Sequence, residues 1–237
     1  MSSGIYVATA GAVAQSNALD ATANNIANAS TAGFHGDKLT FREALSKARS
    51  PDVALVSAGT ARVDTEAGVM QETGNPLDCA LEGDGYFAVN TPSGTRYTRA
   101  GNFQLDANGT LVTSEGNAVR GADGKPITLP TNAANFGIAP DGTVSADGVA
   151  VGQLELVKFA PNQMQRAGGS LFTASGKPAA GDPPTVRNGL VEGSNINVVR
   201  GVVDLVKVSR TYESLMKVIQ GYHDVEQRAA RELGGAK

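Results

Sequence analysis

Glu82 and Asp84 are the side chains in this 237-residue sequence whose type and spacing come closest to those of a catalytic pair. Two neighbouring carboxylates can act as acid and base in a hydrolase that cleaves cell-wall glycan. Gly83 and Gly85 alternate with them, however, and this pattern predicts a solvated turn. The sequence also lacks a G-x-S-x-G elbow, a P-loop and a G-x-G-x-x-G phosphate cradle. We therefore expect a protein that is not an enzyme.

Asp-Gly and Asn-Gly pairs occur several times, as in Asp106-Ala107-Asn108-Gly109, and could belong to calcium loops or to hairpin turns. This segment lacks the further ligands and the distant glutamate that an EF-hand places in order, which favours turns. His35 and His223 are the only histidines, they lie in different segments, and there is no Cys-x-x-Cys pair. We expect neither a metal site nor a cofactor.

Charge and cysteine content narrow the class of protein further. The net charge of −3 and the pI near 5.4 give no basic footprint for nucleic acid or anionic lipid. No apolar run approaches the length of about 18 residues that predicts a membrane span. The first basic residue is Lys38, so the positive start of a signal peptide is missing, and we expect no cleaved signal. Cys79, beside Leu77, Ala80 and Leu81, is interpreted as a small buried hydrophobe.

A helix is predicted from Gly4 to Asn28, because this segment has no proline, one charge and many alanines. It should end before Gly33, which can adopt the left-handed conformation. Small residues such as Ala8 allow neighbouring helices to approach closely. Four apolar residues recur every seven positions and form a narrow seam suited to another helix. They are Ile5, Ala12, Leu19 and Ile26.

The middle of the chain has the composition of β structure. A short helix is expected first, from Phe41 to Ala48, since Thr40 and Glu43 are spaced as a capping box. From about residue 50 to 188, short runs of β-formers alternate with turn dipeptides, which predicts antiparallel hairpins. The predicted strands are 86–89, 96–99, 102–105, 109–112 and 152–159, followed by a connector rich in Gly, Ala and Pro at 174–184.

A second long helix is predicted after Asn197, a plausible N-cap, and can continue without proline to about Leu233. At 1.5 Å per residue it would be about 54 Å long, more than the β domain could cover. The apolar surface that remains on both helices predicts further protein neighbours. The stripe on this helix consists of Val202, Leu205, Tyr212, Met216, Ile219 and Tyr222, with Ser209 interrupting it.

These elements predict an α+β fold, in which long N- and C-terminal helices form a coiled-coil-like pair and flank a central, mainly antiparallel β domain. The expected divisions are an N-terminal assembly helix at 1–35, a connector with a short helix at 36–75, the β domain at 76–173, a connector at 174–194 and a C-terminal assembly helix at 195–237. The expected β core contains Tyr86, Phe87, Phe103 and Leu111.

The segment from Leu19 to Phe34, with its A-N-N-I-A-N core and T-A-G-F ending, resembles the N-terminal signature of flagellar rod and hook proteins. Residues 77–89 and 97–112 resemble the central β signature of that family. Residues 192–198 and 210–213 resemble the entry and body of its terminal helix. The resemblance covers nearly the whole chain in order, and length and detail favour a proximal-rod member. Cys79 stands where the family more often has valine.

The resemblance implies a structural subunit that the flagellar type III apparatus exports without a cleaved signal. Such a subunit would assemble with copies of itself and with other rod proteins into the drive shaft that crosses the periplasm. The alternatives are a distal-rod subunit and, less favoured, a secreted adhesin or other binding module. Subunits joined by contacts that do not close on themselves generate a helical assembly of this kind.

The residues expected at the assembly interface come from both helices. Asn24 and Asn25 lie too early to cap the first helix, so we expect them to bond to neighbouring helices. For Asn28, capping and an interface role both remain open. The family match favours packing or a charge pair at the subunit boundary for three residues of the second helix. These are Arg210, Tyr212 and Glu213.

Overall fold

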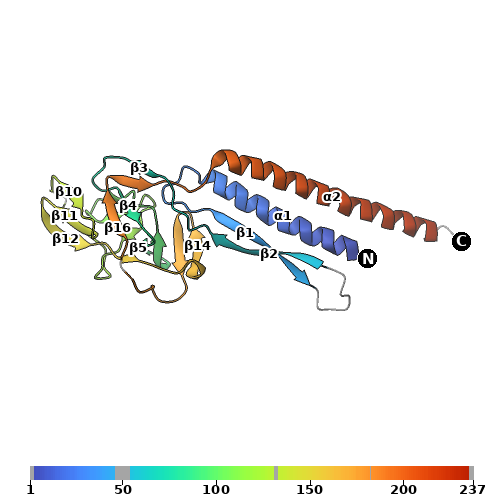
Figure 1. Ribbon diagram of the computed structural model, residues 1–237, viewed down its shortest axis with the longest axis horizontal. Coiled ribbons are helices and arrows are strands. Elements are labelled where there is room, and N and C mark those ends of the chain that lie inside the picture. The colour runs from blue at the N-terminus through green and yellow to red at the C-terminus, as the bar shows by residue number, and fades with distance from the viewer. Residues whose placement is uncertain (1–2, 46–53, 131–132, 182, 235–237) are drawn as a thin grey trace. The chain divides into compact units, whose positions relative to one another are not determined.

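The computed structural model describes residues 3–45, 54–130, 133–181 and 183–234 (Figure 1). The chain divides into two compact units, which we call the helical unit and the β unit. The helical unit contains Met1–Ala27, Asp37–Arg62 and Asn197–Lys237. The β unit contains Asn28–Gly36 and Val63–Ile196.

Two helices form most of the helical unit, α1 (Ser3–Ala27) and α2 (Val198–Gly234), and they lie side by side in Figure 1. Asn197, the N-cap predicted for α2, does cap this helix, because its Oδ1 accepts a hydrogen bond of 3.0 Å from the Arg200 N–H. Helix α1 ends where expected, and Gly33 follows with a φ of 63°.

The two helices are antiparallel and approach each other at glycines. A Cβ atom added at Gly11 would lie 3.3 Å from Leu215 Cδ1, and one at Gly201 would lie 2.9 Å from Ile26 Cγ1. Gly4 likewise faces the ring of Tyr222. As residue numbers rise along α1, those of the facing residues in α2 fall, which defines the antiparallel direction.

The expected coiled-coil-like pair is wrong, although the α+β class fits. Of the four residues in the predicted seam, Ile5 and Ala12 are buried, whereas Leu19 and Ile26 are only half-buried. The other buried residues of α1 are alanines on more than one face, since α1 contacts β1 as well as α2. Close contacts at small residues therefore replace the regular apolar knobs of a coiled coil. The buried alanines are Ala8, Ala12, Ala14 and Ala18.

The prediction of a short helix at 41–48 is also wrong for residues 41–45, which the structure describes. Residues 41–45 belong to strand β1 (Asp37–Leu45), which pairs with β2 (Ala54–Val63), and residues 46–48 lie outside the described residues. A capping box satisfies two backbone donors at a helix end, whereas pairing with a second strand satisfies a whole row of backbone groups. The long-range partner outweighed the local signal.

The β unit is built from small sheets in which every described strand pair is antiparallel. The largest sheet has the order β14-β15-β6-β5-β9-β8-β7, with β13 added on β5. Its strands are β5 (Tyr86–Thr91), β6 (Gly94–Thr98), β7 (Gln104–Leu105), β8 (Leu111–Val112), β9 (Ala118–Val119), β13 (Leu156–Val157), β14 (Met164–Gly168) and β15 (Leu171–Ala174).

The described residues of this unit also form three smaller sheets and one 3-10 helix, η1 (Pro161–Gln163). A three-stranded sheet contains β10 (Phe136–Ile138), β11 (Thr143–Ala146) and β12 (Val149–Gln153). Two strand pairs join β3 (Met70–Glu72) to β17 (Leu190–Glu192) and β4 (Cys79–Glu82) to β16 (Thr185–Asn188). Strands β16 and β17 thus lie inside the segment 174–194 that we expected to be a connector.

The single strand expected at 152–159 is divided between two sheets. Strand β12 ends at Gln153 and pairs with β11, whereas β13 begins at Leu156 and pairs with β5. Leu154 between them forms an isolated bridge with Gly121. Polar and apolar residues alternate from Gln153 to Leu156, across the point where the pairing changes, so this pattern could not reveal the change of partner.

Two apolar clusters form the interior of the β unit. Phe87, Phe103 and Leu111 belong to the larger one, and Tyr86 belongs to the smaller one together with Phe172. The rings of Phe87 and Phe103 meet edge to face, with centroids 5.1 Å apart. All four residues predicted for the core are buried.

Candidate assembly interface and a buried ionic cluster

The N-terminal residues expected at the assembly interface differ in how much surface they leave available. Ile5, Ala8 and Ala12 are buried within the chain itself. Leu19 and Ile26 are half-buried, and Asn24 is exposed. The first part of the predicted apolar seam is therefore not on the accessible surface of α1.

Asn25 bonds to the backbone of β1 within its own chain. Its Nδ2 donates to the carbonyl of Asp37 over 2.9 Å, and the Asp37 N–H donates back to Asn25 Oδ1 over 2.9 Å. In this arrangement the Asn25 side chain bonds to a strand of its own chain, whereas we expected it to bond to a neighbouring helix. Asn28 lies at the helix end, where its Oδ1 accepts a bond of 3.2 Å from the Thr31 hydroxyl.

Helix α2 leaves most of its apolar side chains accessible. No side chain from 198 to 231 is fully buried, and Val202 is 46% exposed. Leu205, Tyr212, Met216 and Ile219 are half-buried. The large apolar side chains that are exposed on α2 are Val198, Val199, Val202, Val203, Val206, Val218, Tyr222 and Val225.

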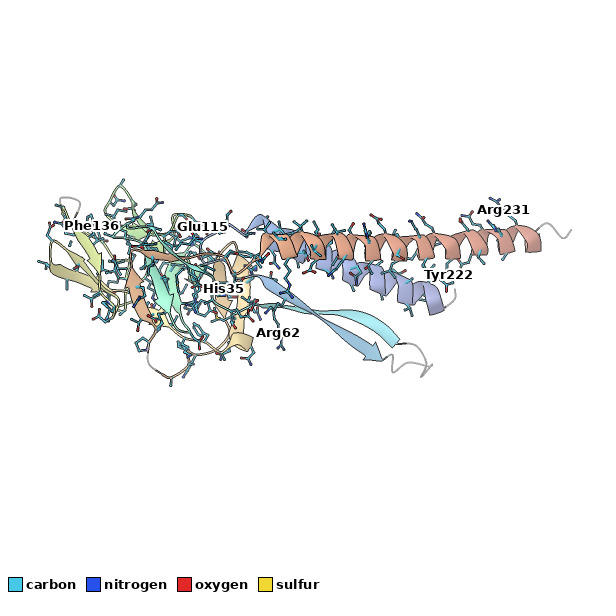
Figure 2. The ribbon with its side chains drawn as sticks, turned by 45° about the horizontal axis from the view of Figure 1, so that its top comes forward. His35, Arg62, Glu115, Phe136, Tyr222 and Arg231 are labelled. Carbon is cyan, nitrogen blue, oxygen red and sulfur yellow. The ribbon has the colours of Figure 1, made fainter. Side chains whose placement is uncertain are left out.

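The two charged residues predicted for a subunit boundary, Arg210 and Glu213, are exposed on α2. Within the described part of the chain, neither forms an ion pair. Beyond Tyr222, which faces the start of α1, every side chain up to residue 231 is exposed (Figure 2). The end of α2 thus extends past the residues that its antiparallel partner covers.

A buried ionic cluster in the β unit was not predicted from the sequence. His35 Nε2 lies 3.0 Å from Glu192 Oε1, and both side chains are almost completely buried (His35 is labelled in Figure 2). Arg99 Nη1 lies 3.5 Å from Glu192 Oε2, and the Gly68 N–H donates to Glu192 Oε1 over 3.0 Å. His35 Nδ1 faces the carbonyl oxygen of Asp64 at 2.8 Å.

The charge on Glu192 is stabilised in spite of its burial. Burial alone raises the pKa of the Glu192 carboxyl, because it penalises the charged form. The hydrogen bond from His35, the guanidinium of Arg99 and the Gly68 N–H act in the opposite direction and outweigh burial. The pKa of Glu192 therefore lies below its ordinary value.

Backbone hydrogen bonds tie together the segments that carry this cluster. The Gly33 N–H donates to the Glu192 carbonyl over 2.7 Å, and the Asn195 N–H donates to the Phe34 carbonyl over 3.2 Å. The Asn195 side chain accepts from the Gly36 N–H over 2.8 Å and donates to the carbonyls of residues 64 and 66. We call the three segments 33–36, 64–69 and 192–196 the clasp.

The carboxylate pair considered for catalysis is separated by its ion pairs. Asp84 pairs with Lys158 at 3.1 Å, whereas Glu82 faces Arg187 at 3.6 Å, and both acidic side chains are largely exposed. Lys158, Asp84 and Tyr86 border a cavity of about 250 Å³. Because each carboxylate is neutralised by a different cation, the geometry does not resemble an acid and base acting on one bond.

Two general observations concern the described residues. Among them, no group of three or more His, Cys, Asp or Glu side chains is placed to hold a metal ion. None of the helices in the described ranges combines the length and apolar character needed to cross a membrane.

Comparison with known families gives a match to each of three successive parts of the chain, which contain α1, strands of the β unit, and α2. Residues 5–35 match the family described as flagella basal body rod protein. Residues 80–146 match the flagellar hook protein FlgE/F/G D1 domain, and residues 187–232 match the flagellar basal body rod FlgEFG protein C-terminal region. The three matches follow each other along the chain without overlap.

Similar curated proteins extend over almost the whole chain. The flagellar basal-body rod protein FlgF of Escherichia coli strain K12 is 38% identical over 98% of this chain and 99% of its own. FlgF of Rhizobium meliloti strain 1021 is 31% identical over 100% of both chains, and FlgG of Bacillus subtilis strain 168 is 34% identical over 88% and 90%. The chain belongs to the family of flagellar basal-body rod proteins. Its role is that of a structural subunit of the basal-body rod.

Proposed function

We propose that this chain is a proximal-rod subunit that assembles helically, with copies of itself and with other rod proteins, into the torque-transmitting shaft. The observation that carries the proposal is the exposed apolar surface of α2, on which no side chain from 198 to 231 is fully buried. A soluble helix with eight exposed large apolar side chains requires other protein surfaces to cover them.

The interface of this assembly is proposed to include the accessible residues of both helices. On α1 these are Leu19, Ile26 and the exposed Asn24. On α2 they are Val202, Leu205, Arg210, Tyr212, Glu213, Met216 and Ile219. Repeated contacts of one patch with a different patch on the next subunit would extend without closing, as a rod requires.

A non-enzymatic role and an extracytoplasmic location belong to the same proposal. The separate ion pairs of Glu82 and Asp84 support a structural role over an acid and base pair. We propose that the protein is exported through the flagellar type III apparatus without a cleaved signal and resides in the part of the rod that crosses the periplasm. The similarity to flagellar basal-body rod proteins over almost the whole chain supports this proposal.

The second candidate is a distal-rod subunit of the same family, which the similarity to FlgG of Bacillus subtilis favours. A secreted adhesin is supported less well, because a binding module has no need for two helices with exposed apolar surfaces. An electron cryomicroscopy reconstruction of basal bodies from the source cells distinguishes these candidates. Side-chain density that fits this sequence in the proximal rod is expected; density only in the distal rod, or none in the rod, would contradict the proposal.

A further inference from the structure

The exposed large apolar side chains of the β unit are concentrated on two strands. Among the described residues of this unit they are Val69, Met70, Val149 and Val151. Val69 immediately precedes β3 and Met70 begins it, whereas the two other valines belong to β12. Both strands lie at the edge of their sheets. The surface of the β unit is therefore apolar at two strand edges.

Strand β3 has one free edge. The Gly193 N–H donates to the Val69 carbonyl over 2.9 Å, so the backbone of Val69 faces β17. Successive residues of a strand direct their backbone groups to opposite sides, so those of Met70 and Glu72 point away from β17. No strand of the described residues pairs with β3 on that side, and every side chain of β3 is exposed.

Strand β12 is open along its first residues. One side of it pairs with β11, and on the other side the Ala122 N–H donates to the Gln153 carbonyl over 2.8 Å. The chain then turns, with a hydrogen bond of 2.8 Å from the Gly121 N–H to the Lys125 carbonyl, and residues 149–151 stay exposed. A cavity of about 270 Å³ lies between this turn and β12, with Val151 in its lining.

The open edge of β12 lacks the usual protection against pairing. Natural sheets protect an exposed edge with charged residues, proline or a covering segment. The sequence of β12 is Val-Ala-Val-Gly-Gln, which contains no charge and no proline. An edge of this kind is suited to receive an additional strand from another chain, which would form backbone hydrogen bonds along it.

Charges beside the two edges are complementary. Glu72 of β3 and Lys125 in the turn beside β12 are exposed, and neither forms an ion pair within the described part of the chain. The acidic residues near β12 already accept hydrogen bonds from the backbone of neighbouring residues. These are Asp123, Asp141 and Asp147. A free anion at one apolar edge thus matches a free cation at the other.

The two edges cannot meet within one chain, because β3 and β12 belong to different sheets and lie apart in Figure 1. We propose that β3 of one copy pairs with the open edge of β12 in the next copy, an inference that rests on the proposed assembly of this chain with copies of itself. Met70, with its flexible side chain, enters the cavity beside β12. The contact joins two different surfaces, so each added copy leaves one edge of each kind for a further copy.

Crosslinking in isolated basal bodies tests this pairing. The full-length chain carries Met70→Cys and Ala150→Cys together, both at exposed positions, while the native Cys79 is fully buried. A short bismaleimide should link the copies into dimers and larger products, because opposed residues of paired strands lie about 4.5–5.5 Å apart. Each single variant should give no such products, since the contact brings position 70 beside position 150 and not beside itself.

Two further substitutions control for accidental contacts. Val151→Lys, added to the double-cysteine chain, should lower the yield of linked copies on the order of tenfold, because a charge on an edge strand opposes pairing. Gln165→Lys, at an exposed position of edge strand β14, is the matched control and should leave the yield unchanged. Both positions are exposed, so both variants should keep the melting transition of the parent.

The outcomes separate this pairing from the proposed function. A chain that is present in basal bodies without linked copies would overturn the pairing and leave the rod role intact. Linked products from a single variant would show a symmetric contact and also overturn it. A chain that is absent from basal bodies would contradict the proposed function and, with it, the pairing.

A measurement on the parent decides independently of any substitution. An electron cryomicroscopy map of basal bodies should show β3 of one copy about 4.8 Å from β12 of the next, the spacing of hydrogen-bonded strands. A map in which the two strands are further apart, or in which a different rod protein covers either edge, would refute the proposal.

Discussion

The helical unit and the β unit differ in which apolar side chains they bury. In the β unit, aromatic and large aliphatic residues from distant strands fill two continuous clusters. In the helical unit, the buried residues of α1 are Ile5 and four alanines, and α2 has no fully buried side chain from 198 to 231. The β unit therefore contains the interactions that stabilise a folded domain, whereas the helical unit leaves large apolar side chains of α2 exposed.

This difference predicts that stability and assembly can be disrupted separately. Large side chains removed from the β unit leave cavities and lower its free energy of unfolding. Under the proposed function, changes in the helices should impair assembly with other subunits instead. The following changes test that separation, from the largest expected effect to the smallest.

Ala12→Pro should abolish rod assembly while the β unit remains folded. Ala12 is buried in the middle of α1, where proline removes a backbone donor, clashes with the preceding turn and costs about 3 kcal/mol or more. We expect a normal protein level in cells, an unchanged melting transition of the β unit, incomplete rods and no motility. Swimming assays, electron microscopy of basal bodies and calorimetry measure these outcomes.

Two controls separate assembly from other effects of this change. Ala12→Ser keeps the backbone donor and most of the volume, so it should retain motility. Secretion must be measured by blotting periplasm and medium, because export could depend on the same N-terminal segment. Normal swimming and complete rods in Ala12→Pro cells would contradict the role of α1 in assembly.

Phe103→Ala should destabilise the β unit by about 3–5 kcal/mol, because it removes a buried ring and leaves a cavity. Phe103 is 2% exposed and packs against the edge of Phe87. Urea unfolding monitored by circular dichroism measures the loss. Val149→Ala is the matched control, since Val149 is 68% exposed and its truncation should change stability by no more than about 0.5 kcal/mol. An unchanged midpoint for Phe103→Ala would mean that the ring contributes nothing to the core.

Glu192→Gln should destabilise the β unit by about 1.5–3 kcal/mol at neutral pH, since it removes a buried charge that His35 and Arg99 contact. The pKa of Glu192 is lowered in the folded protein. Its contribution is therefore complete above the ordinary glutamate pKa of about 4.3 and is lost as pH falls through the lower folded value. Urea midpoints of parent and variant should converge on acidification below about pH 4. A difference that stays constant from pH 7 to pH 3 would argue against this carboxylate as the source.

The sequence predicted the elements whose signals are local. The limits of α1 and α2 follow from proline-free segments, the glycine at 33 and the cap at Asn197, and all of these depend on neighbouring residues. Strand β1 was missed because its partner β2 lies beyond the local pattern that indicated a helix. Pairing between segments overrides weak local preferences in this way.

The ionic cluster could not be predicted for a similar reason. His35 and Glu192 are 157 positions apart, and neither shows a spacing that indicates its partner. The glycines and asparagines around them carried the family resemblance, but the buried contact depends on how three segments meet in the clasp. For the assembly residues, the sequence located the two apolar helices, whereas self-burial of Ile5, Ala8 and Ala12 depends on the packing of α1 within its own chain.

The smallest expected effect is that of Ala12→Pro on the reactivity of Cys79, a thiol that can report whether the β unit opens. This thiol is fully buried in the larger apolar cluster, and burial, with a smaller contribution from Asp78, raises its pKa far above the ordinary range. Reaction with a thiol reagent requires the thiolate, so at pH 8 it should occur only when the β unit opens. The rate in Ala12→Pro should match that of the parent within about twofold, because the helix change does not alter the core around Cys79. Phe103→Ala should raise the rate on the order of a hundredfold or more, as a loss of about 3 kcal/mol increases the open population. Fast labelling of the folded parent, or equal acceleration by both variants, would show that the two units do not separate stability from assembly.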